Sequence, residues 1–183
     1  MSDAGTATAD DASEAGDDGY SGVLGTYPYA FRQSESRLLR SYVVLGGLFT
    51  LFAGFLFTFA FVTTVAGTLG AAGGTFTFVR SFVLFVGMAV VFPLMAPVIL
   101  VARRHRRSVS TLAYDRALAA SGYLLAASVY LMLVISAPAE LRDTPSGATA
   151  PVVEVLYDLP PVASVVPPLA VILVGYLLHR RYR

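Results

Sequence analysis

The sequence contains no cysteine and no tryptophan, and it also lacks lysine and asparagine. Without these residues the chain has no disulfides, no thiol or Schiff-base chemistry and no site for N-linked glycosylation. Charge is scarce as well, because only 14% of the residues are charged, against about 25% in soluble domains. Together with a mean hydropathy of +0.67, this composition excludes a soluble domain and indicates a membrane protein.

Four long stretches of the sequence contain no charged residue. They run from Ser41 to Val79, from Ser81 to Ala102, from Ala117 to Ala139 and from Leu159 to His179. A helix needs about 20 apolar residues to cross a bilayer, so each stretch predicts one crossing, at about 42–66, 82–102, 117–137 and 160–179. The fold class that we expect is therefore all-α, an integral-membrane four-helix bundle.

The arginines lie mainly on one side of these predicted crossings. Eleven of the thirteen precede the first crossing, separate the second from the third, or follow the fourth. Only Arg80 and Arg142 lie on the other side. Positively charged flanks are retained in the cytoplasm during insertion. We therefore expect a multi-pass protein of the cell membrane with both termini in the cytoplasm.

The N-terminal segment 1–24 differs in composition from the rest of the chain. Six of the twelve acidic residues lie there, among alanine, glycine, serine and threonine. Such a segment cannot bury enough apolar surface to fold. The segment 1–24 is predicted to be a disordered acidic cytoplasmic tail, and 25–183 the four-span domain. The acidic tail and the use of arginine without lysine favour a halophilic source.

The first crossing carries small residues at four-residue intervals, at Gly46, Thr50, Gly54 and Thr58. In lipid, small side chains let helix backbones approach closely and gain van der Waals contact. This stripe predicts a packing face, either inside the four-helix bundle or between two copies of the chain.

Proline pairs predict kinks in the second and fourth crossings, at Pro93 and Pro97 and at Pro167 and Pro168. A proline inside a helix removes one N–H donor and crowds the carbonyl four residues earlier. The freed carbonyls of the second crossing need hydroxyl partners. We expect these partners to come from the third crossing, at Ser121, Tyr123, Ser128 and Tyr130.

Just before the fourth crossing, apolar and acidic residues separate onto two faces of a helix. Val152, Val155 and Leu156 fall on one face, whereas Glu154 and Asp158 fall on another. This pattern predicts a short amphipathic helix lying flat on the extracellular surface.

The search for chemistry in the sequence gives no catalytic, cofactor-binding or metal-binding residue. No acidic or basic residue falls inside a predicted crossing, which disfavours ion-coupled carriers and proton pumps. His105 and His179 lie beside arginines at the cytoplasmic ends of crossings, and two imidazoles without a carboxylate or thiolate are a poor ligand set. Phosphate-loop, hydrolase and zinc-protease motifs are absent from the sequence. We expect no cofactor and no enzymatic activity.

The strongest electrostatic feature is the arginine cluster, which consists of Arg103, Arg104, Arg106 and Arg107. Arginines next to a crossing attract anionic lipid head groups by about 1 kcal/mol each. We expect the cluster to contact anionic membrane lipids. Nucleic acid is not an expected partner, because the basic patch is short and no folded reader domain accompanies it.

Three motifs accompany the four-span pattern: Gly-Thr-Tyr-Pro-Tyr-Ala-Phe-Arg at 25–32, Ser-Arg-Leu at 36–38, and the arginine cluster. In these motifs the chain resembles uncharacterised four-span membrane proteins of halophilic archaea, from residue 25 to the C-terminus. The resemblance implies a membrane location and a haloarchaeal source, and it assigns no functional residues.

The function that we expect is that of a structural or accessory membrane component, acting through helix packing and through contact with lipids or a partner protein. The alternative is a pore or transporter subunit formed by oligomers around the proline-containing crossings. A polar cavity open to both membrane faces would favour transport, whereas a dry assembly packed on small residues would favour the accessory role.

Overall fold

The computed structural model describes residues 22–70, 74–107, 111–142 and 144–182. Its elements are α1 (Gly22–Gln33), α2 (Arg37–Gly67), α3 (Gly74–Arg107), α4 (Leu112–Ile135), η1 (Ala139–Leu141), α5 (Ala150–Asp158), η2 (Pro161–Val165) and α6 (Val166–Arg181). The described residues contain no strand. The predicted all-helical class is therefore confirmed.

Four helical segments are long and apolar enough to cross a membrane: α2, α3, α4, and η2 together with α6. This number agrees with the four crossings predicted from the sequence. Three of the helices begin earlier than their predicted crossings, since α2 starts at Arg37, α3 at Gly74 and α4 at Leu112. The crossings were bounded by charged residues, whereas the helices continue through residues such as Arg80 and Asp115.

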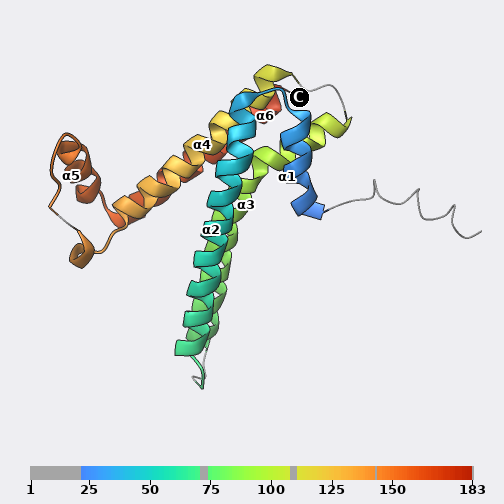
Figure 1. The fold of residues 1–183 in the computed structure, drawn as a ribbon. Helices are drawn as coiled ribbons and strands as arrows, with labels where there is room; N and C mark the ends of the chain where they lie inside the picture. The colour runs from blue at the N-terminus through green and yellow to red at the C-terminus, as the bar shows by residue number, and fades with distance from the viewer. Residues whose placement is uncertain (1–21, 71–73, 108–110, 143, 183) are drawn as a thin grey trace, which may run out of the picture.

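The four long helices form two hairpins that diverge from each other. In Figure 1, α2 lies beside α3, and α4 lies beside α6. The hairpins meet where α2 and α4 begin and where α3 and α6 end, and from there they run in different directions (Figure 1). The four helices thus share contacts at one end of the molecule and are separate pairs at the other.

Burial differs between the two halves of α2. Its buried residues all lie between Leu39 and Ala53, in the half of the helix near the meeting point. The other half presents large exposed rings, such as Phe55 and Phe59, rather than buried small residues. The buried part of α2 is therefore the half of the helix near the meeting point of the hairpins.

The hydrophobic core lies at the meeting point of the two hairpins. It contains residues from α1, α2, α3 and α4, namely Ala30, Leu39, Tyr42, Val43, Val98, Val101, Ala102, Tyr114, Leu118 and Ala119. Two tyrosines, Tyr42 and Tyr114, are the largest of the fully buried side chains. One end of the molecule therefore holds the core that joins the helices.

Helix α1 packs against α3 and α2 and was not predicted as a helix. It begins at Gly22, inside the range 1–24 expected to be an acidic tail, and residues 1–21 of that range lie outside the described residues. Pro28 lies within the helix, and proline usually argues against a helix interior. Tertiary contact compensates, because Ala30 is fully buried and the Tyr27 ring lies against Gly47 of α2.

The prolines of the two hairpins occupy different kinds of position. Pro93 and Pro97 lie inside α3, which continues through both of them. Pro167 and Pro168 instead lie in the first turn of α6, directly after the 3-10 helix η2. The N–H groups of a first turn have no partner within their own helix, so proline costs little there.

Among the described residues, the hydroxyl groups of Ser121, Tyr123 and Ser128 in α4 do not supply the expected hydrogen bonds to α3. Ser121 and Ser128 donate to carbonyls of their own helix, at 2.8 and 2.7 Å, and Tyr123 donates to Ser41 at 2.8 Å. The hydroxyl that reaches the proline region is that of Tyr42 in α2, which donates to the Leu94 carbonyl at 2.6 Å. The prediction named the wrong helix as the donor. Tyr42 is the first residue of the first predicted crossing, and its sequence position does not show that it reaches the proline region of α3.

Helix α5 lies at the far end of the α4–α6 hairpin (Figure 1). None of its nine residues, all of them described, is buried. Arg142 holds the end of α5 near the end of α4, because its guanidinium donates to the carbonyls of Tyr157 and Ala137 at 2.9 and 3.0 Å. The helix predicted before the fourth crossing is therefore present.

Candidate functional site: the arginine-rich end

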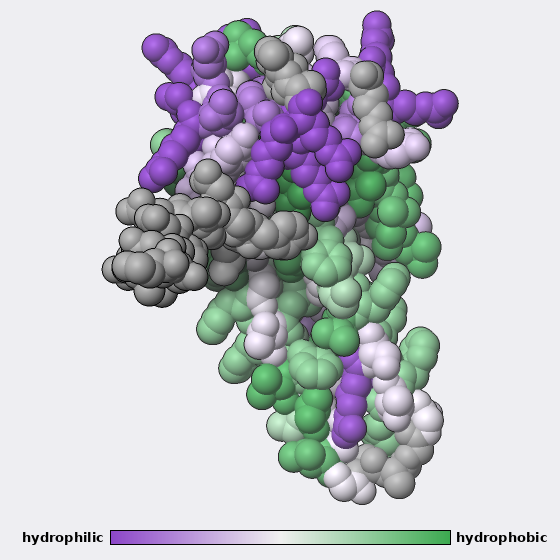
Figure 2. Space-filling model, turned by 90° about the vertical axis from the view of Figure 1, so that its right-hand side faces the viewer, coloured by the Kyte–Doolittle hydropathy of each residue, from purple (hydrophilic) through white to green (hydrophobic). Residues whose placement is uncertain are grey.

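Hydrophilic residues gather at one end of the molecule, and hydrophobic residues cover most of the length below it (Figure 2). This end is the meeting point of the hairpins, where the last turns of α3 and α6 carry Arg104, Arg106, Arg107, Arg180 and Arg181. Beneath these charges lie two networks of buried polar side chains.

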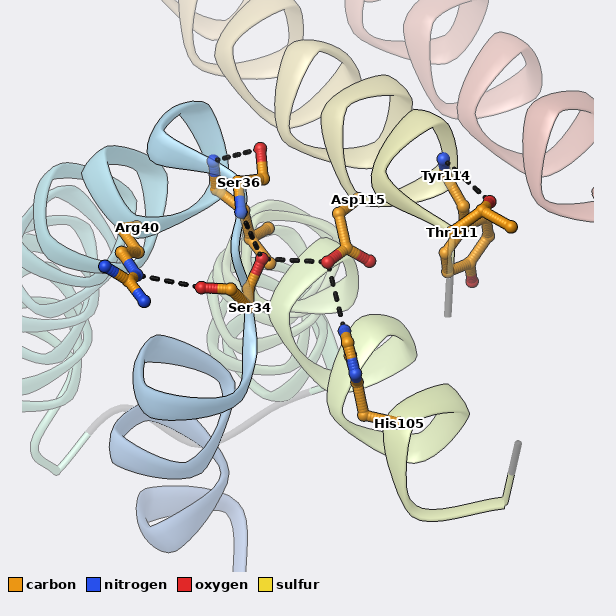
Figure 3. A network of polar contacts seen from close by, with 8 residues as sticks. Ser34, Ser36, Arg40, His105, Thr111, Tyr114 and Asp115 are labelled. Carbon is orange, nitrogen blue, oxygen red and sulfur yellow. Dashed lines mark hydrogen bonds and ion pairs between the residues drawn. The ribbon is translucent and has the colours of Figure 1, made fainter. Parts of the chain in front are cut away.

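The first network is centred on the carboxylate of Asp115, which is only 2% exposed. The hydroxyl of Ser34 donates to its Oδ2 atom at 2.8 Å, and Nε2 of His105 lies 3.0 Å from the same oxygen (Figure 3). Ser34 lies in the link between α1 and α2, His105 near the end of α3, and Asp115 in the first turn of α4. One carboxylate thus joins three parts of the chain; we call this network the Asp115 junction.

The local backbone holds Ser34 in place for this contact. The N–H of Ser36 donates to the Ser34 hydroxyl at 3.1 Å, and Nε of Arg40 donates to the Ser34 carbonyl at 2.8 Å. Ser36 itself is the N-cap of α2 and accepts a hydrogen bond from the N–H of Leu39. Short polar residues of this kind are preferred at helix starts, which explains why α1 ends and α2 begins here.

The second network joins α3, α4 and α6. The Tyr114 hydroxyl lies 2.7 Å from Nδ1 of His179. The guanidinium of Arg104 lies 4.3 Å from the centre of the Tyr114 ring and donates a hydrogen bond to the carbonyl of Tyr182. Cation–π contact gains strength when the cation is partly removed from water. Arg104 is therefore held inside the fold rather than directed into solvent.

The structure corrects the expectation that both histidines lack a carboxylate neighbour. His105 contacts Asp115, ten positions away in sequence and in the next helix. The sequence placed Asp115 outside the third crossing, so its burial could not be anticipated. Within the part of the chain that the structure describes, no three side chains of His, Cys, Asp or Glu gather as a metal site would require. His105 and Asp115 form a structural pair in this arrangement.

The members of the arginine cluster have different surroundings. Arg104 contacts Tyr114 and Tyr182, as described above, and the Arg106 guanidinium lies 4.7 Å from the centre of the Tyr29 ring in α1. Arg103, Arg106 and Arg107 are all exposed. A cavity of about 500 Å³ lies between α1 and α3 and is lined by Gly22, Thr26, Ile99, Ala102, Arg103, Arg106 and Arg107.

A second, largely apolar cavity of about 420 Å³ lies between α3, α4 and α6. Pro93 and Pro97 line it from α3, Ser121 and Leu125 from α4, and Ile172 from α6. The proline face of α3 therefore does face α4, although across a cavity and without the predicted hydrogen bonds.

The small residues predicted to form a packing stripe lie in different environments. Gly46 lies under the ring of Tyr42 in the preceding turn, and Gly54 and Thr58 line a cavity between α2 and α3. Thr50 is buried, and its hydroxyl donates to the Gly46 carbonyl at 2.7 Å. The stripe thus faces the core at one end and the α2–α3 cavity at the other.

The closest packing contact at this end involves a glycine that the sequence did not single out. A Cβ atom added to Gly122 of α4 would lie 2.3 Å from the Tyr42 ring. The same ring meets Tyr123 edge to face, with 5.2 Å between the ring centres. Gly122 thus makes room for Tyr42, and no spacing rule links two residues on different helices.

Tyr27 of α1 is the aromatic residue whose acidity the fold alters most clearly outside the long helices. Burial raises the pKa of its hydroxyl above 10.0, and a hydrogen bond with Thr50 offsets part of that effect. The phenol therefore stays neutral at physiological pH and serves as a packing residue between α1 and α2.

The described residues form an all-helical fold with four candidate membrane-spanning helices and a polar, arginine-rich end. These features are typical of helical membrane proteins with several spans. The chain belongs to the family described as a domain of unknown function, DUF8056, whose model matches residues 1–183. No curated protein and no solved structure matches the chain.

Proposed function

We propose that this protein is a structural or accessory component of the cell membrane, which acts by packing its helices against lipid and against a partner membrane protein. The observation that carries the proposal is the exposure of α6. Of its sixteen residues, only Pro168 is buried, and its main helical neighbour is α4. Such a helix leaves most of its surface free for contacts outside the chain.

The exposed surface of α6 is apolar and continuous along the helix. It includes Leu169, Leu173, Tyr176 and Leu177, each more than half exposed. A membrane protein partner can pack against this face through van der Waals contact, which lipid tails otherwise supply. The proposal rests on this packing surface and needs no enzymatic step.

The proposal includes an orientation with both termini in the cytoplasm and α5 outside. Its support is the gathering of arginines at the end where α3 and α6 terminate, since positive flanks favour the cytoplasmic side. Single cysteines can test it, because the chain has none of its own. An impermeant thiol reagent added outside should label cysteines at Thr75 and Ser146 and leave Ser110→Cys unlabelled. Labelling of Ser110→Cys would contradict the orientation.

The proposal also includes a kinked α3 and a bent start to the fourth crossing. The support is the position of Pro93 and Pro97 inside α3, together with the way α3 leaves the side of α2 near its C-terminal end in Figure 1. For the fourth crossing, the support is the change from the 3-10 helix η2 to α6 at Val166. Proline is the usual cause of such bends.

A haloarchaeal source stays part of the proposal and is supported by the acidic N-terminal composition and the absence of lysine. The competing role as a pore or transporter subunit needs a polar route across the membrane. The cavity between α3, α4 and α6 is lined mainly by apolar side chains, which favours the accessory role.

The test is gentle purification from the native membrane followed by mass measurement of the intact complex. We expect a partner protein in fixed stoichiometry. The double substitution Leu173→Ala and Leu177→Ala on α6 should reduce the yield of that partner. Phe85→Ala in α3, where the side chain is 69% exposed, is the matched control and should leave the yield unchanged. A homo-oligomer without a partner that conducts solutes in liposomes would contradict the accessory role.

A further inference from the structure

We propose that the cavity between the start of α1 and the end of α3 binds the phosphate group of an anionic membrane lipid. This inference rests on the proposed function, in which the protein contacts membrane lipids. It assigns the attraction between the arginines and anionic head groups to one binding site. The cavity has a volume of about 500 Å³, within the range of about 300–1,000 Å³ that is typical of ligand sites. We call it the arginine cavity.

Three arginines of α3 line the arginine cavity, namely Arg103, Arg106 and Arg107. Arg103 lies three and four positions before Arg106 and Arg107, and residues at these spacings can meet on one face of a helix. Among the described residues, an ion pair joins His105 and Asp115, and none involves Arg103, Arg106 or Arg107. Arginine binds phosphate oxygens through paired N–H donors, which makes phosphate a fitting ligand.

Helix α1 gives the cavity its second wall and orients one of the arginines. Tyr29 lies beneath the Arg106 guanidinium, at 4.7 Å from the ring centre. A preorganised guanidinium loses less side-chain entropy when it binds. The Thr26 hydroxyl already donates to the Gly22 carbonyl at 3.1 Å, so the arginines supply the donors of this site.

Arg104 is the member of the arginine cluster that lies outside this site. Its guanidinium contacts the Tyr114 ring of α4 and the Tyr182 carbonyl at the end of α6. The structure thus divides the cluster into one arginine that stabilises the fold and three that line a cavity. A uniform head-group attraction would not require this division.

The position of the arginine cavity along α3 favours a lipid over a free anion. Ile99 and Ala102 form its apolar wall, and the uncharged stretch of α3 ends at Ala102. A lipid phosphate at the arginines would leave its hydrocarbon chains next to Ile99 and the apolar helix surface. Basic pockets at the cytoplasmic ends of membrane helices bind anionic head groups in this manner.

The test uses the full chain in detergent, titrated with phosphatidylglycerol and, separately, with phosphatidylcholine. Native mass spectrometry counts the lipids retained on each protein molecule. We expect one phosphatidylglycerol to be retained at concentrations at which phosphatidylcholine is not. The double variant Arg103→Gln, Arg107→Gln should bind phosphatidylglycerol at least about tenfold more weakly, given about 1 kcal/mol per arginine.

A matched control removes two charges from the same end of the molecule. Arg180→Gln with Arg181→Gln should change the affinity by less than about twofold, because these residues do not line the arginine cavity. A third variant, Thr26→Phe, fills the cavity and leaves the charge unchanged, and it should also abolish retention. Thermal unfolding of each variant separates loss of the site from loss of the fold.

Two outcomes would overturn the proposal. Equal weakening by the two double variants would show a diffuse charge effect without a site. Displacement of the retained lipid by millimolar inorganic phosphate would show a site for free anions. The accessory role is judged separately, by the partner that purifies with the protein, so failure of the lipid site and failure of the proposed function are distinguishable.

Discussion

The two ends of the helices are built differently. At the arginine-rich end, four helices share a core around Tyr42 and Tyr114, and buried polar contacts such as the Asp115 junction join them. At the other end, each hairpin stands alone, and large side chains such as Phe55 and Phe85 are about two-thirds exposed. The chain's own contacts therefore stabilise the arginine-rich end, whereas the side chains at the other end must be covered by lipid or by another protein.

The largest effect should follow from Asp115→Ala. Removing the carboxylate leaves the Ser34 hydroxyl and the His105 ring without their shared partner in a buried place. Loss of a buried partner costs about 3 kcal/mol, so the free energy of unfolding in micelles should fall by about that amount. Asp158→Ala, at the exposed end of α5, is the control and should cost less than about 0.5 kcal/mol. Equal losses in both variants would erase the contrast between the ends.

A somewhat smaller effect should follow from Gly122→Ala. The new methyl group would lie 2.3 Å from the Tyr42 ring, and overpacking of this kind costs about 1–3 kcal/mol. Gly54→Ala is the matched control at the edge of the packed region, because no described heavy atom lies within 4 Å of a Cβ there. In that helix interior, alanine should be neutral or stabilising by up to about 1 kcal/mol.

Unfolding of both glycine variants in the same detergent measures this difference. Destabilisation of similar size at the two glycines would mean that α2 is packed evenly along its length. A further check is Tyr42→Ala in the Gly122→Ala background, which removes the clash. The two substitutions should then be non-additive, as expected for residues in direct contact.

The smallest effect should follow from Tyr42→Phe. This change removes the hydroxyl that donates to the Leu94 carbonyl at 2.6 Å and keeps the ring in its place. Hydrogen bonds between membrane helices contribute about 0.6–2 kcal/mol, so a loss of about 1 kcal/mol is expected on unfolding. Tyr130→Phe, in a side chain that is 65% exposed, should have no measurable effect. If Tyr42→Phe leaves the free energy of unfolding unchanged, this hydrogen bond does not help to join α2 to α3.

Hydropathy predicted the number of long helices, because a long apolar run in lipid must form a helix to satisfy its backbone hydrogen bonds. The helix before the fourth crossing was likewise predicted from local residue types. What could not be predicted were contacts between helices. Asp115 lies just outside the third predicted crossing, and nothing local distinguishes it from the exposed Asp158. Helix α1 was missed for the same reason, since its stability comes from packing on α3.

In the candidate site, too, the contacts between helices could not be predicted from the sequence. The sequence grouped Arg103, Arg104, Arg106 and Arg107 as one basic patch, because charge alone cannot show direction. In the structure, Arg104 is held by Tyr114 and Tyr182, whereas the other three line the arginine cavity. The aromatic partners that separate them come from helices far away in sequence.

The Asp115 junction has a consequence for the order in which the protein is made. Ser34 and His105 leave the ribosome before Asp115, so the first hairpin is complete while its two polar groups still await the carboxylate. Only the start of α4 supplies that carboxylate, from a residue 81 positions after Ser34. A nascent chain that stops after α3 therefore lacks the carboxylate that Ser34 and His105 contact in the complete fold. Synthesis of the second hairpin supplies it.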